Sequence, residues 1–162
     1  MLSADMSRRS PVVLLVTVVF FLAGLWILNL QAQQARDTRR KLDLADLEIA
    51  LLRSLATTGT LPPENAPSWC GVLGTPEHAA IRTAIEGLLR ETGAYRNPAK
   101  PFPSDPRWRG TPRDYAYAKT SPVSFELLAE LEADRNDSRP LADCGTDTAY
   151  DYGIASLARH PL

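Results

Sequence analysis

Two cysteines and two histidines are the residues of this chain best suited to covalent or metal chemistry. Cys70 and Cys144 could form a disulfide outside the cytoplasm, where closing so long a loop would contribute about 4 kcal/mol in the chain-entropy model. The alternative is two unrelated thiols, with Cys70 buried beside Trp69. A zinc site that also uses His78 and His160 is not expected, because the sequence has neither a C-x-x-C motif nor paired histidines.

Oxygen-bearing side chains are frequent near the C-terminus. They are Asp134, Asn136, Asp137, Asp143, Asp147 and Asp151. Such groups suit Ca²⁺, so calcium binding is one interpretation. An EF-hand loop starting at Asp134 would have Arg139 at its glycine position and Gly145 at its glutamate position. We therefore predict a solvated loop, with no metal ion and no cofactor.

Sequence motifs of enzymes are missing. The chain contains no glycine-rich phosphate loop, no H-E-x-x-H and no G-x-S-x-G, and each histidine stands alone. The formal net charge of −1 gives no basic excess for neutralising phosphates, which argues against nucleic-acid binding. We expect neither an enzyme, nor a nucleic-acid partner, nor a small-molecule substrate.

The elements that must position these residues begin with an uncharged apolar segment. Residues 11–30 have the sequence PVVLLVTVVFFLAGLWILNL, in which fourteen of twenty residues are Val, Leu, Ile or Phe. At about 0.4 kcal/mol per such residue, membrane insertion gains roughly 6 kcal/mol. Twenty helical residues also match the ~30 Å thickness of the hydrocarbon layer. The segment is therefore predicted to be a transmembrane helix that follows a short tail of residues 1–10.

Two signal sequences are alternatives to a permanent membrane helix. A cleaved signal peptide would use Arg8 and Arg9 as its basic start and Ala32 as a poor cleavage site, but the apolar run exceeds the usual 7–15 residues. A twin-arginine signal would have a bulky apolar residue after Ser10, where this chain has Pro11. We expect the mature chain to retain its N-terminal segment.

The membrane helix is predicted to continue as an amphipathic helix over residues 31–58. This segment has no proline or glycine and is rich in strong helix formers. Gly59 suits the position just after a helix, and Pro62 and Pro63 prevent its resumption. The polar part before Leu42 is expected to be solvated, with exposed ion pairs between Asp37 and Lys41 and between Arg39 and Asp43.

Beyond residue 42, apolar residues recur at helical spacing and must pack against something. The predicted packing face consists of Leu42, Leu44, Ile49, Leu52 and Leu55. A coiled coil is the alternative, but Ala and Thr occupy several of its seam positions, so we favour packing on a sheet.

Residues 59–162 are predicted to form a globular head. Its first part, residues 61–74, is proline-rich and is interpreted as an ordered loop. Thr75 as N-cap and Pro76 in the first turn then indicate a helix that Gly93 ends. Segments 114–119 and 123–131 have strand patterns and can pair as a hairpin, and residues 150–157 form either a last strand or an ordered tail. The fold class is therefore α+β: a long helix packed on a small antiparallel sheet of two or three strands, with one extra helix.

The order of these features resembles type IV pilins and the pseudopilins of type II secretion systems, especially small bacterial pilin-like proteins. One matching stretch is ARDTRRKLDLADL at residues 35–47, followed by GTLP at residues 59–62. The other is FPSDP at residues 102–106, followed by the hairpin that contains Tyr115, Tyr117, Phe125 and Leu131. The matches span roughly residues 35–132. The resemblance implies a pilin-like, membrane-anchored structural component of a type II secretion or type IV pilus-related system, with the lipid bilayer and other such subunits as partners.

The N-terminus departs from the prepilin pattern. Prepilins have a glycine at the cleavage site and a glutamate that neutralises the neighbouring subunit's new amine. This chain has no glycine before Gly24 and no acidic residue between Asp5 and Asp37. A pilin-like head on a permanent anchor is therefore expected.

Charge alone leaves the membrane orientation open. Two basic residues precede the span, but four follow it closely, which would keep the head in the cytoplasm. Pilin heads face outward with similar basic residues after the helix, so the resemblance implies a single-pass protein with an extracytoplasmic head. One alternative function is an anchored extracytoplasmic binding module with no role in filament assembly, and another is an inward-facing scaffold with free thiols. The candidate ligand contacts of the binding module are Trp69, Trp108, Tyr115 and Tyr150.

Overall fold

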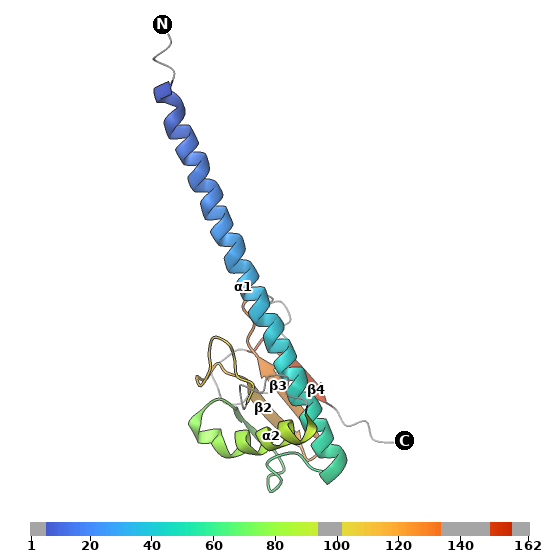
Figure 1. Ribbon diagram of the computed structural model, residues 1–162. Coiled ribbons are helices and arrows are strands. Elements are labelled where there is room, and N and C mark those ends of the chain that lie inside the picture. Colours follow the sequence, from blue (N-terminus) through green and yellow to red (C-terminus); the bar gives the residue numbers. More distant parts are fainter. Residues whose placement is uncertain (1–5, 94–101, 134–149, 157–162) are drawn as a thin grey trace.

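The computed structural model describes residues 6–93, 102–133 and 150–156, and the side chains from residue 11 onward. Its arrangement is α+β, as predicted: one very long helix, a second helix and an antiparallel sheet (Figure 1). The N-terminal half of the long helix extends away from the head, and its C-terminal half packs on the sheet.

Helix α1 (Met6–Thr58) is continuous over 53 residues, or about 80 Å. It starts five residues before Pro11, which lies in its second turn and removes one helical hydrogen bond. It ends as predicted at Gly59, whose φ of 75° is left-handed and whose N–H donates to the carbonyl of Leu55 at 3.0 Å.

The second helix begins later than predicted. Thr75 precedes one turn of 3₁₀-helix, η1 (Pro76–His78), and the α-helix α2 covers Ala79–Thr92. The Thr75 side chain makes no capping bond and donates instead to the carbonyl of Val72 at 2.9 Å. Gly93 ends α2 with a φ of 62°, which confirms its predicted role.

In the described residues the sheet has four strands, compared with the two or three predicted, in the order β1-β2-β3-β4, and all neighbours are antiparallel. The strands are β1 (Trp69–Val72), β2 (Ala116–Ser121), β3 (Ser124–Ala129) and β4 (Tyr152–Ser156). The predicted hairpin is β2 and β3, and the segment left open as strand or tail is β4. The interpretation of residues 61–74 as wholly loop is wrong, since β1 lies there. Four residues after a proline-rich stretch carry too weak a pattern, and pairing with β2 decides their conformation.

The helix packing face is only partly as predicted. Leu44 is fully buried and Leu55 packs against the core, whereas Leu42, Ile49 and Leu52 have exposed fractions of 47%, 48% and 39%. The buried row is instead Leu44, Leu47, Ala50 and Leu51, which meets α2 and the sheet. Both rows have helical spacing, so periodicity cannot tell which one the head covers.

Candidate functional site

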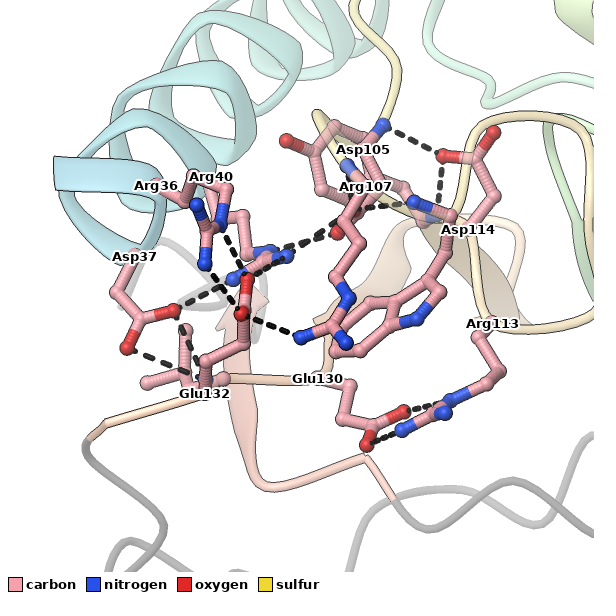
Figure 2. A network of polar contacts seen from close by, with 12 residues as sticks. Arg36, Asp37, Arg40, Asp105, Arg107, Arg113, Asp114, Glu130 and Glu132 are labelled. Atoms are coloured by element: carbon pink, nitrogen blue, oxygen red, sulfur yellow. Dashed lines mark hydrogen bonds and ion pairs between the residues drawn. The ribbon is translucent and has the colours of Figure 1, made fainter. Parts of the chain in front are cut away.

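Arg40 lies at the centre of a cluster of charged residues where α1 meets the head (Figure 2). Its side chain is fully buried. Nε and Nη2 donate to the two carboxylate oxygens of Asp105 at 2.6 and 3.1 Å. Nη1 donates to Asp37 at 2.6 Å, and Nη2 also donates to Glu132 at 2.9 Å. One guanidinium therefore joins α1 to the loop before β2 and to the segment after β3.

Two further arginines donate hydrogen bonds to Glu132. Arg36 donates to it from Nε and Nη2, both at 2.7 Å, and Arg107 donates from Nη1 at 2.7 Å. The hydrogen bond with Arg36, followed by those with Arg40 and Arg107, lowers the pKa of Glu132 to about 2 despite its burial. We call these six residues the charged junction: Arg36, Asp37, Arg40, Asp105, Arg107 and Glu132. Its three cations balance its three carboxylates.

Backbone N–H groups complete the coordination of the acidic side chains. Asp37 accepts hydrogen bonds from the backbone N–H groups of Glu132 and Ala133 at 2.9 and 2.8 Å. Asp105 accepts from those of Arg107 and Trp108 at 2.7 and 2.9 Å. Asp37 therefore binds the backbone of the segment that carries Glu132, and Asp105 binds the backbone of the loop that carries Arg107. The junction thus fixes backbone as well as side chains.

The Asp114 side chain also binds the backbone of the loop that carries Asp105. Its oxygens accept hydrogen bonds from the backbone N–H groups of Asp105, Gly110 and Tyr115, each at 2.8 Å. Burial raises the pKa of Asp114. The carboxylate lies so close to Gly74 that a Cβ there would come within 1.9 Å of Oδ2, so this position has no room for a side chain.

One turn further along α1, a polar contact continues the junction into the core. The Tyr115 hydroxyl donates to Asp43 at 2.9 Å, and Arg39 donates to the same carboxylate at 3.3 Å. The predicted pair of Arg39 and Asp43 is therefore formed, but Asp43 is buried and not exposed as predicted. Burial raises the pKa of Asp43 and of Tyr115. Asp37, predicted to pair with Lys41, has an ion pair with Arg40.

The aromatic residues suggested as ligand contacts are used mainly for packing. Tyr115 and Tyr150 are buried, and the Trp69 ring packs edge-on against His78 with ring centroids 5.0 Å apart. Trp108 is half-buried. Three guanidinium groups lie over its ring at 4.1 to 5.5 Å, those of Arg40, Arg107 and Arg113.

Of the residues predicted for covalent or metal chemistry, Cys70 and His78 lie in the part of the chain that the structure describes. Cys70 lies in β1 opposite Ala118, and Cys144 lies outside the described residues, so the bridge stays a prediction. His160 also lies outside them. The rest of the acidic C-terminal set does too, except Asp151, which accepts a hydrogen bond from the backbone N–H of Leu131 at 2.6 Å.

The prediction that the polar part of α1 is solvated is wrong at the charged junction, which sequence analysis missed. One signal could have found it. The buried row of Leu44, Leu47 and Leu51, continued toward the N-terminus in steps of four, reaches Arg40 and then Arg36. The buried face of α1 thus continues into charged residues. Buried charges need oppositely charged partners, which here must come from elsewhere in the chain.

The apolar N-terminal half of α1 lies outside the hydrophobic core of the head. Its apolar side chains from Val12 to Leu28 are exposed, and among the described residues it is the one helix long and apolar enough to cross a membrane. Comparison with known proteins adds no further assignment: no family model, curated protein or solved structure matches this chain.

Proposed function

We propose that the chain is a membrane-anchored, pilin-like structural component of a type II secretion or type IV pilus-related assembly, with its head outside the cytoplasm. The observation that carries the proposal is the single uninterrupted helix α1. Its N-terminal half is apolar and uncovered, while its C-terminal half is built into the head. A long apolar helix packed on a small antiparallel sheet is compatible with a pilin-like fold.

The charged junction supports a mechanical rather than a catalytic role. Arg36 comes only six residues after Leu30, the end of the predicted span, which is about 9 Å along the helix. The head is thus held directly where the helix would leave the bilayer, without a flexible linker. A subunit that assembles through its helix needs this fixed geometry, whereas a tethered binding module does not.

The exposed row on α1 offers a surface for the partner subunits. Leu42, Ile49 and Leu52 lie on the helix face that the head leaves uncovered. The row lies on the same helix as the exposed apolar N-terminal half, beyond the polar residues 31–41, so a neighbouring helix could pack along both. Each such contact would bury apolar area at about 25 cal/mol per Å².

Photo-crosslinking in native membranes tests the proposal. A photoreactive amino acid at Ile49 is expected to capture other pilin-like or secretion-system subunits, and the same group at Thr83, which is exposed on α2, is the matched control. Capture of a soluble or surface ligand at Trp108, with no subunit captured at Ile49, would contradict the proposal and favour the binding module. Protease digestion of intact spheroplasts should remove the head, and full protection would contradict the extracytoplasmic orientation.

A further inference from the structure

A polar groove lies between α1 and the head at the membrane end of the molecule. It has a volume of about 480 Å³ and is lined by Asn29, Gln33, Arg36, Pro106 and Arg107. The first three residues follow one another along α1, and the last two belong to the loop that the charged junction holds against the helix. The groove is therefore built by the same contacts that fix the head.

The position of the groove along α1 is that of lipid headgroups. Asn29 is the penultimate residue of the predicted span, and Arg36 lies about 9 Å beyond the end of the span. The headgroup layer on each side of the hydrocarbon is about 5–8 Å thick. Trp26 lies one turn before Asn29, and tryptophan is enriched at membrane interfaces. The groove thus opens at the level of the phosphates.

The charge of the groove suits an anion. The side chains of Arg36 and Arg107 have exposed fractions of 31% and 55%, and the carboxylate that they share, Glu132, has 2%. Two guanidinium groups therefore face the groove in front of one buried carboxylate. Each guanidinium has five N–H donors, and Arg107 donates only Nη1 to Glu132. Side-chain amides of Asn29 and Gln33 add uncharged donors on the helix side.

We propose that this groove binds the phosphate of an anionic phospholipid in the leaflet from which α1 emerges, and so docks the head on the bilayer surface. The proposal rests on the membrane anchoring part of the proposed function and is independent of any assembly. Arg107 is the specificity-determining residue, because it comes from the head and reaches the groove only when the charged junction is formed.

Lipid retention by the full-length chain tests the proposal. The chain is placed in nanodiscs of equal phosphatidylglycerol and phosphatidylcholine, and native mass spectrometry measures which lipid stays bound after release. Phosphatidylglycerol is expected to be retained preferentially, and Arg107→Gln should reduce the preference about fivefold, the contribution of one basic residue at an anionic surface. Arg107→Lys keeps the charge and should keep the preference. Arg90→Gln is the matched control, because Arg90 is also an exposed arginine paired with one carboxylate.

Three results would overturn the proposal. One is equal retention of the two lipids by the native chain, and another is an equal loss in Arg107→Gln and Arg90→Gln. The third is binding of inorganic phosphate in lipid-free micelles that Arg107→Gln abolishes, without any lipid preference in nanodiscs, which would identify a site for a free anion. A chain that does not enter the nanodiscs would overturn the membrane anchoring as well, so the two failures are distinguishable. Thermal unfolding of each variant verifies that the head remains folded.

Discussion

At the scale of single residues, the charged junction combines burial with complete pairing. Burial lowers the pKa of the Arg40 guanidinium, but hydrogen bonds with Asp105, Glu132 and Asp37 outweigh it and raise the pKa overall. Removing a charged group from water is costly, and a buried ion pair gains little net stability over a well-packed apolar equivalent. Removing one partner is different, because it leaves the opposite charges buried and uncompensated.

Truncation of Arg40 is therefore expected to be severe. Arg40→Ala leaves the carboxylates of Asp37 and Asp105 without their main cation and should lower the free energy of unfolding by about 3–5 kcal/mol. Arg90→Ala removes an exposed arginine and should cost under about 1 kcal/mol. Chemical denaturation of the full chain in detergent, followed by near-ultraviolet circular dichroism, measures both. Similar midpoints for the two variants would mean that the junction does not hold the head to α1.

Glu132 should make stability depend on pH in the acid range. Its pKa is lowered to about 2 in the folded chain from an ordinary value near 4.5, so the folded state favours the charged form. This contribution is fully present above about pH 4.5 and is lost as pH falls toward 2. Asp43 and Asp114 act in the opposite direction, because burial raises their pKa values and the folded state favours their protonated forms.

The comparison of native protein with Glu132→Gln isolates the contribution of Glu132 from those of the other carboxylates. The difference in unfolding free energy between the two is expected to be largest above pH 5, at about 2–3 kcal/mol, and to shrink as pH falls to 2. Unfolding titrations at a series of pH values measure it. A difference that stays constant over this range would show that Glu132 is not held ionised by its arginines.

At the scale of elements, α1 has two different apolar rows, and only one faces the head. Leu44, Leu47 and Leu51 are fully buried against α2 and the sheet. On the sheet side, Tyr117 and Lys119 hold the loop after α1: the Tyr117 hydroxyl donates to the carbonyl of Pro62 at 2.7 Å, and Lys119 Nζ donates to that of Leu61 at 2.8 Å. The helix and the sheet are thus joined at both ends of their contact.

Adjacent leucines in α1 provide a matched test of this orientation. Leu51→Asp places an unpaired charge in the core and should lower the free energy of unfolding by several kcal/mol. Leu52→Asp changes a residue with an exposed fraction of 39% and should cost under about 1 kcal/mol. Thermal unfolding of both variants measures the two losses of stability. A larger loss of stability for Leu52→Asp than for Leu51→Asp would show that α1 packs on the head through its other apolar row.

At the scale of the whole molecule, the exposed apolar half of α1 and the packed head are separable. In the described structure, the first α1 residue held by the charged junction is Arg36. Everything before it is helix without contacts to the core. The head should therefore fold without the apolar N-terminal half of α1, provided that Arg36, Asp37 and Arg40 are kept.

Two truncations test this separation. Deleting residues 1–33 should give a soluble, folded monomer, because the entire junction and the buried row of α1 remain. Deleting residues 1–41 also removes Arg36, Asp37 and Arg40, which leaves Asp105 and Glu132 buried without Arg40, and should prevent stable folding. Size-exclusion chromatography and near-ultraviolet circular dichroism distinguish the outcomes. Aggregation of both proteins would show that the N-terminal half of α1 takes part in folding the head.

The sequence by itself determined the features that depend on local chemistry. The apolar run of residues 11–30 needs only its composition, Gly59 and Gly93 end helices through their own backbone freedom, and β2 and β3 follow from strand patterns in consecutive segments. Tertiary structure decided the rest. Strand β1, the buried row of α1 and the charged junction depend on contacts between segments far apart in the chain, such as Arg40 with Asp105 and Glu132. Both apolar rows of α1 have the same helical periodicity, so periodicity cannot tell which row is buried. A charged residue is stable when buried only if distant partners neutralise it, and a local sequence pattern does not contain those partners.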